Sequence, residues 1–157
     1  MTQLHRRTFL KGTLATSVVA VAASAGLLKP TRVLAAEWPK DAFAAKSMEE
    51  MLKSLYGNTD ATVSGSIKIK APIQAENGSV VPISVSTSLP NVESIALVVE
   101  KNPQPLVASV NLKGADGYFS ARMKMGSTSD VHCVVKSGGK LYSAKQNIKV
   151  TVGGCGG

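Results

Sequence analysis

The sequence has few of the residues from which metal, cofactor and nucleic-acid sites are usually built. Its 157 residues include two cysteines, two histidines, one tryptophan, three tyrosines and three phenylalanines. No Cys-x-x-Cys or His-x-x-x-His motif occurs, which argues against a structural zinc site. There is no cluster of lysine and arginine and no series of stacking aromatic residues, so we expect no nucleic-acid partner. No cofactor motif is present either, and we expect neither a cofactor nor a metal.

Positive charge is concentrated at the start of the chain. The formal net charge is +8, but the first 35 residues contain five basic residues and no acidic residue. Removing those five from the 18 basic residues leaves 13, which against 10 acidic residues gives a net charge of +3. That value is ordinary for the surface of a soluble protein. A length of 157 residues suits one domain together with an export signal.

Residues 1–35 have the organisation of an export signal. Arg6 and Arg7 precede Phe-Leu-Lys, an apolar run covers residues 12–28, and small residues follow at 33–36. This pattern is typical of a cleaved twin-arginine signal, although His5 stands where Ser or Thr is usual. A transmembrane anchor is the alternative, but the run is short for a bilayer span. We expect the mature protein to lie in the periplasm without a membrane anchor. The twin-arginine route exports folded proteins, so we also expect co-export with a bound partner.

The last five residues place one thiol between two pairs of glycines, as Gly153-Gly154-Cys155-Gly156-Gly157. Glycine has the widest backbone freedom and no side chain, so these residues predict a slender flexible arm with an exposed sulfur. Fully extended, such an arm reaches about 16 Å. Catalytic sites need rigid elements and orienting neighbours. We therefore expect Cys155 to be an attachment point that enters the active sites of other proteins. A tail cysteine without a role is the alternative.

The middle of the chain is dominated by strand patterns. Alternating or continuous apolar runs separated by turn signals predict about seven strands, at residues 66–73, 81–87, 94–100, 106–112, 118–125, 131–136 and 141–152. The run at 94–100 is nearly continuously apolar, which predicts a strand buried on both faces. For residues 36–152 we predict a mostly β fold, an immunoglobulin-like antiparallel sandwich.

One short helix is predicted before the strands. Ser47 and Glu50 form a capping-box pattern, apolar residues follow at helical spacing, and Gly57 ends the segment. The helix should therefore cover about residues 48–56. Residues 37–45 are expected to form an extended lead-in, with Trp38 and Phe43 in the core.

Other sulfur and imidazole groups offer alternative chemistry. Met123 and Met125 share a strand face and could bind Cu(I), so a periplasmic copper-binding module, or a purely structural binding module, is the alternative function. His132 and Cys133 are adjacent on a strand and should point to opposite faces. Cys133 is expected to be a buried core residue, with a disulfide to Cys155 as the alternative. Catalysis by Cys155 itself would need a base and an oxyanion hole, which the tail does not offer.

Taken together, these features resemble a known family. Residues 149–157 are similar to the carboxyl terminus of SoxY, the sulfur-carrier subunit of the bacterial thiosulfate-oxidising Sox system. The resemblance extends to the twin-arginine signal, to residues 38–57, and to the block Met125-Gly126-Ser127-Thr128 with Leu141-Tyr142. Cys133 is not part of the family motif.

The resemblance implies a carrier rather than an enzyme. Cys155 would hold the substrate as a covalent adduct, and the four glycines around it would let the arm enter narrow channels. A SoxZ-like subunit, a second small sandwich protein without its own signal, would form a heterodimer with this chain. A c-type cytochrome would join thiosulfate to the thiol, and a di-manganese hydrolase would release sulfate. A molybdenum-containing sulfane dehydrogenase, where present, would oxidise the remaining sulfur. The catalytic residues would belong to these partners.

Overall fold

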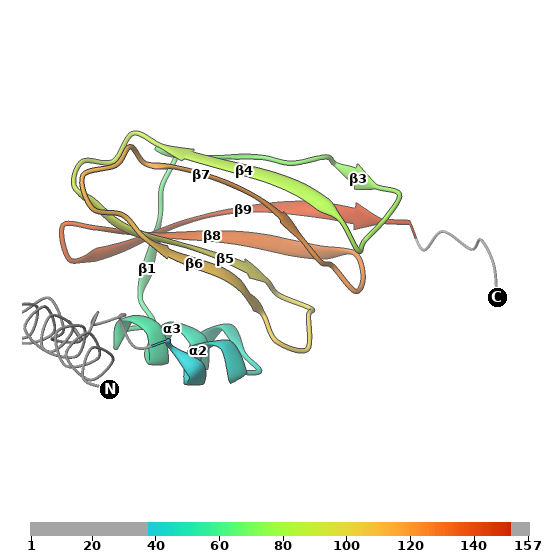
Figure 1. Cartoon of the computed structure of the whole chain (residues 1–157), viewed down its shortest axis with the longest axis horizontal. Coiled ribbons are helices and arrows are strands. Elements are labelled where there is room, and N and C mark those ends of the chain that lie inside the picture. The colour runs from blue at the N-terminus through green and yellow to red at the C-terminus, as the bar shows by residue number, and fades with distance from the viewer. Residues whose placement is uncertain (1–37, 152–157) are drawn as a thin grey trace, which may run out of the picture. The chain divides into compact units, whose positions relative to one another are not determined.

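The computed structural model describes residues 38–151, and Figure 1 shows how their elements are arranged. Within this range two short helices precede nine strands. The helices are α2 (Lys40–Ala44) and α3 (Met48–Tyr56). Neither of these helices is long and apolar enough to cross a membrane. The predicted signal at residues 1–35, with Arg6 and Arg7, lies outside the described residues.

The strands form two sheets. The larger sheet has the order β1-β9-β8-β5-β6, and β3 also pairs with β9. Its strands are β1 (Ala61–Val63), β3 (Gln74–Ala75), β5 (Val92–Val99), β6 (Leu106–Asn111), β8 (Ser129–Ser137) and β9 (Lys140–Val150). The smaller sheet has the order β2-β4-β7, with strands β2 (Ile67–Lys70), β4 (Val81–Thr87) and β7 (Tyr118–Met123). All pairs are antiparallel except for the two short strands β1 and β3, which run parallel to β9. The predicted mostly β sandwich is confirmed.

The larger sheet forms the middle layer. One face packs on the smaller sheet, and the other face packs on α2 and α3 (Figure 1). Along β5, Ile95 and Leu97 belong to the core between the sheets, whereas Ala96 and Val98 belong to the core under the helices. Burial of this strand on both faces, predicted from its continuous apolar run, is therefore confirmed. The same alternation in β8 directs Cys133 into the core between the sheets.

The helix at Met48–Tyr56 has the predicted caps. The Ser47 hydroxyl accepts a hydrogen bond from the Glu50 backbone N–H at 3.2 Å. The Glu50 carboxylate reaches back to the N–H of Lys46 at 3.1 Å, one residue before the cap. Gly57 ends the helix in the left-handed region at a φ of +72°. Local capping chemistry thus sets both ends of the helix.

The extended lead-in predicted for residues 37–45 is wrong. Lys40–Ala44 is the helix α2, with Pro39 at its N-cap and Asp41 in its first turn. Ala42 is fully buried, and Phe43 packs against the core under the larger sheet. Trp38, expected in the core, is 63% exposed. A helix this short is stabilised chiefly by packing, which local sequence patterns do not report.

Candidate functional site

The predicted attachment residue lies just beyond the described chain. Cys155 and its flanking glycines, Gly153, Gly154, Gly156 and Gly157, are outside the described residues, so their roles remain predictions. The structure describes the chain as far as Thr151. It therefore shows how the last strand before the predicted arm is held.

The end of β9 is held along both of its edges. On one edge, the Thr151 N–H and hydroxyl both donate to the carbonyl oxygen of Ala75, at 3.0 and 3.2 Å. On the other edge, the Val150 N–H donates to the Thr128 hydroxyl at 3.0 Å, and that hydroxyl contacts the Val150 carbonyl oxygen at 3.4 Å. These contacts fix the end of the strand that precedes the predicted arm.

The loop that carries Thr128 is itself fixed by two neighbours. The side-chain amide of Asn102 donates to the Lys124 carbonyl at 2.8 Å and accepts from the Gly126 N–H at 3.0 Å. The Met125 N–H donates to the Gly78 carbonyl at 2.7 Å. A Cβ at Gly78 would collide with the Met125 carbonyl oxygen, so this close approach requires glycine. Thr128 is therefore presented to β9 from a rigid loop.

Cys133 is a buried thiol. Its side chain is fully buried between the sheets, and burial raises the pKa of the thiol to about 12. A thiol with such a pKa stays protonated at neutral pH and is a poor nucleophile. Cys133 is a free cysteine, and Cys155, its partner in the alternative disulfide, lies outside the described residues. The sequence prediction of a core cysteine is confirmed.

The two methionines proposed as copper ligands lie in the hydrophobic core. Met123 is 2% exposed and Met125 is 3% exposed, and both pack among the apolar side chains between the sheets. His132 lies on the opposite face of β8 from Cys133, as predicted, and its Nε2 is 3.3 Å from a carboxylate oxygen of Glu100. Met123 and Met125 therefore do not form a solvent-accessible metal site with His132 or Cys133.

A cluster that sequence reasoning missed surrounds His132. One ligand atom from each of Glu100, Asp130 and His132 lies within 4.8 Å of the other two. Asp130 is already occupied, because its carboxylate accepts from the side chains of Asn147 at 2.6 Å and Lys145 at 3.0 Å. These two hydrogen bonds, that of Asn147 first, hold the pKa of Asp130 below its ordinary value. The arrangement is an ion-pair network at the surface. The pairing of β5 with β8 brings Glu100 beside Asp130 and His132, and the pairing of β8 with β9 adds Lys145 and Asn147, so the members carry no motif in the sequence.

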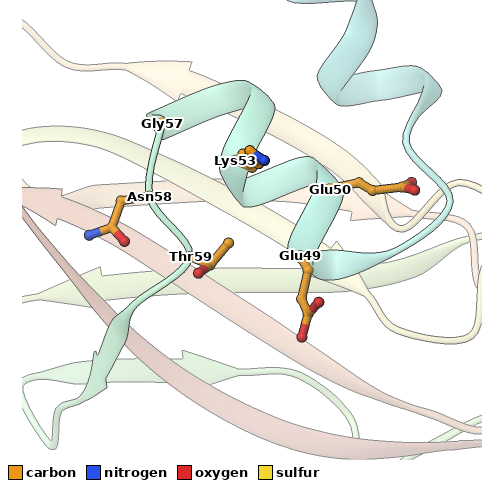
Figure 2. A pocket seen from close by; sticks show the side chains of 6 residues that line it. All are labelled: Glu49, Glu50, Lys53, Gly57, Asn58 and Thr59. Carbon is orange, nitrogen blue, oxygen red and sulfur yellow. The ribbon is translucent and has the colours of Figure 1, made fainter.

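An open pocket lies beside α3 and the segment that follows it (Figure 2). It is lined by Glu49, Glu50, Lys53, Gly57, Asn58 and Thr59. These six residues include no thiol and no imidazole. The pocket therefore offers no thiol to which sulfur could be attached.

Comparison with known proteins agrees with the arrangement of the strands. The family model of the sulfur oxidation protein SoxY matches residues 52–155. The solved structure of the sulfur carrier protein SoxY from Chlorobium limicola f thiosulfatophilum is 37% identical, with a TM-score of 0.62. It covers 72% of this chain and 99% of that chain.

A more distant likeness concerns the fold alone. The superoxide reductase (neelaredoxin) from Ignicoccus hospitalis is 18% identical, with a TM-score of 0.50, and covers 55% of this chain and 80% of that chain. Comparison with curated proteins gives no match. The family match, by contrast, runs from the helix α3 through every strand to Cys155. This extent, together with the agreement in three dimensions with a solved SoxY, shows that the chain belongs to the SoxY family of sulfur oxidation proteins.

Proposed function

We propose that this chain holds thiosulfate-derived sulfur covalently on Cys155 and presents it to other Sox proteins. Membership of the SoxY family makes the chain a sulfur carrier of the Sox system rather than a catalyst, and a partner of other Sox proteins. The contrast between its two thiols supports Cys155 as the attachment point. Cys133 is fully buried with a pKa raised to about 12, whereas Cys155 stands between pairs of glycines within the family match.

Loading the carrier is a two-electron oxidation. A sulfur–sulfur bond forms between the Cys155 sulfur and the outer sulfur of thiosulfate, and the thiol releases its proton. The two electrons pass to haem acceptors, for which we propose a c-type cytochrome as partner. The product is a cysteine S-thiosulfonate. This step needs an accessible thiol that can ionise, and Cys133 does not meet that requirement.

Unloading proceeds by hydrolysis and further oxidation. Water breaks the bond between the outer sulfur and the sulfonate sulfur, so that sulfate leaves with the water oxygen. The carrier keeps a persulfide with one proton, and a second proton is released. We propose a di-manganese hydrolase for this step. A molybdenum-containing sulfane dehydrogenase, where present, would remove six electrons from the persulfide sulfur and add three oxygen atoms from water. A second hydrolysis then releases sulfate and restores the thiol.

We also propose a place and a permanent partner for the carrier. The Arg6-Arg7 pair and the apolar run after it support export to the periplasm by the twin-arginine route. That route carries folded proteins, which supports co-export with a SoxZ-like subunit that lacks its own signal. The chain would then remain in the periplasm as a heterodimer.

Replacing each cysteine in turn tests the proposed function. We expect Cys155→Ser to abolish thiosulfate-dependent reduction of the cytochrome in a reaction reconstituted from the complete set of Sox proteins. The matched control is Cys133→Ala, which removes the buried thiol and should retain the wild-type rate. Wild-type turnover by Cys155→Ser would contradict carriage on this residue and would favour a purely structural subunit.

A further inference from the structure

We propose that Thr128 is a positioning residue that fixes the pivot from which Cys155 reaches a partner's active site. This inference rests on the proposed function and deepens it. It concerns the block Met125–Thr128, which resembles the family but has no part in holding sulfur. The described structure places this block against the last strand before the predicted arm.

The Thr128 hydroxyl extends the pairing of β8 with β9 beyond its last backbone pair. Backbone register between the two strands ends at Ser129 opposite Ile148. Two residues further along β9, the Val150 N–H donates to the Thr128 hydroxyl at 3.0 Å. The same hydroxyl donates to the Val150 carbonyl at 3.4 Å. One side chain therefore satisfies both backbone groups of Val150, as a paired strand would.

The opposite edge of β9 is held by hydrogen bonds at the same position along the strand. The Ala75 carbonyl accepts from both the N–H and the hydroxyl of Thr151, at 3.0 and 3.2 Å. The Lys149 N–H donates to the Ile73 carbonyl at 2.9 Å. Thr128 is thus one half of a two-sided clamp, in which the other half is made by backbone groups and the Thr151 hydroxyl. Of the two halves, the Thr128 side can be removed by changing one side chain.

The clamp sets the length of chain between the last residue that these contacts hold and the thiol. Cys155 is four residues after Thr151, a reach of roughly 13 Å when extended. If loss of the Thr128 half lets the Ala75 half open as well, so that β9 is held only as far as Lys149, the chain from the last held residue to Cys155 grows to six residues. For a flexible tether, the effective concentration of its end falls with about the −3/2 power of its length. The longer tether therefore predicts roughly a twofold lower effective concentration, before any loss of direction is counted.

Thr128→Val is the direct perturbation, because valine keeps the shape and removes the hydroxyl. Thr128→Ser restores the hydroxyl and should rescue the effect. Thr87→Val is the matched control. Like the Thr128 hydroxyl, the Thr87 hydroxyl accepts a hydrogen bond from a backbone N–H, that of Leu89 at 3.2 Å. Thr87 is the last residue of β4, however, whereas the other end of β4, at Val81, pairs with Met123 near the Thr128 loop. Thr87 is thus six residues along the strand from that end.

Two measurements separate positioning from folding. Amide hydrogen exchange of Val150 should become roughly tenfold faster in Thr128→Val, since one or two modest hydrogen bonds are lost. The rate at which thiosulfate and the cytochrome partner load Cys155 is then followed by mass spectrometry. We expect loading of Thr128→Val to be about twofold slower or more, with Thr128→Ser and Thr87→Val at the wild-type rate. Reaction of Cys155 with a small aromatic disulfide should be the same in all four proteins, because that reagent needs no pivot.

The outcomes distinguish this inference from the proposed function. If wild type and Thr128→Val load at the same rate, the positioning role is overturned while carriage stands. Equal slowing by Thr87→Val also overturns it, because the effect would then be one of general stability. If wild type itself acquires no adduct, the proposed function fails and the positioning role fails with it.

Discussion

The buried thiol of Cys133 should make the protein less stable as the pH rises above about 9. Burial raises the pKa of this thiol from its ordinary 9.0 to about 12 in the folded protein. Between these two values the unfolded chain binds fewer protons than the folded chain, so the free energy of unfolding falls with pH. The stabilisation is fully present below pH 9 and is lost as the pH rises towards 12. From the two pKa values, the loss at pH 10 is about 1.4 kcal/mol.

Urea unfolding of wild type and Cys133→Ala, at pH 8 and pH 10 with a reductant present, measures this loss. Other groups titrate in the same range, among them Tyr56, whose pKa burial also raises. Groups that do not interact with Cys133 contribute alike to both proteins and cancel in the difference, and Cys133 is the smallest of the causes that act on the pKa of Tyr56. Wild-type stability minus variant stability should fall by about 1.4 kcal/mol between the two pH values. A difference that does not change with pH would refute the desolvation of Cys133. The grounds for treating Cys155 as the one reactive thiol would then be lost.

Two further predictions concern packing. Met51 is fully buried between α3 and the larger sheet, so Met51→Ala should lower the free energy of unfolding by about 2–5 kcal/mol; a loss below about 1 kcal/mol in urea unfolding would show that the helices do not pack there in solution. At Gly78 a Cβ would collide with the Met125 carbonyl, whereas at Gly65 it would meet nothing within 4 Å. Gly78→Ala should therefore lower the melting temperature and cost about 1–3 kcal/mol, while equal melting of Gly78→Ala and Gly65→Ala would contradict the close approach.

Local signals in the sequence were enough to predict most of the fold. Ser47, Glu50 and Gly57 set the ends of α3 by contacts within a few residues, so the pattern alone located that helix. Continuous apolar residues identified β5 as a strand buried on both faces. The helix α2 was missed because its five residues depend on packing rather than on propensity. The strands β1 and β3 are too short for a period of two to show, and their parallel pairing with β9 joins distant parts of the chain.

For the candidate site too, local sequence signals predicted some features and not others. Cys155 is recognisable from its glycine neighbours, and the burial of Cys133 could be predicted from its apolar strand. The contact of Thr128 with Val150, and the grouping of Glu100 with His132, could not be predicted. The first depends on the register between β8 and β9 and on the position of a loop, and the second depends on the pairing of β5 with β8, none of which a local pattern specifies. Strand register follows from tertiary packing, which a single sequence does not show.

Intact-mass spectrometry of the mature protein from cells grown on thiosulfate, followed by peptide mapping, tests the central claim most directly. The account predicts a reductant-sensitive thiosulfonate or persulfide on the peptide that contains Cys155, with Cys133 unmodified. An unmodified Cys155, both in these cells and after incubation with thiosulfate and the purified partner enzymes, would contradict it.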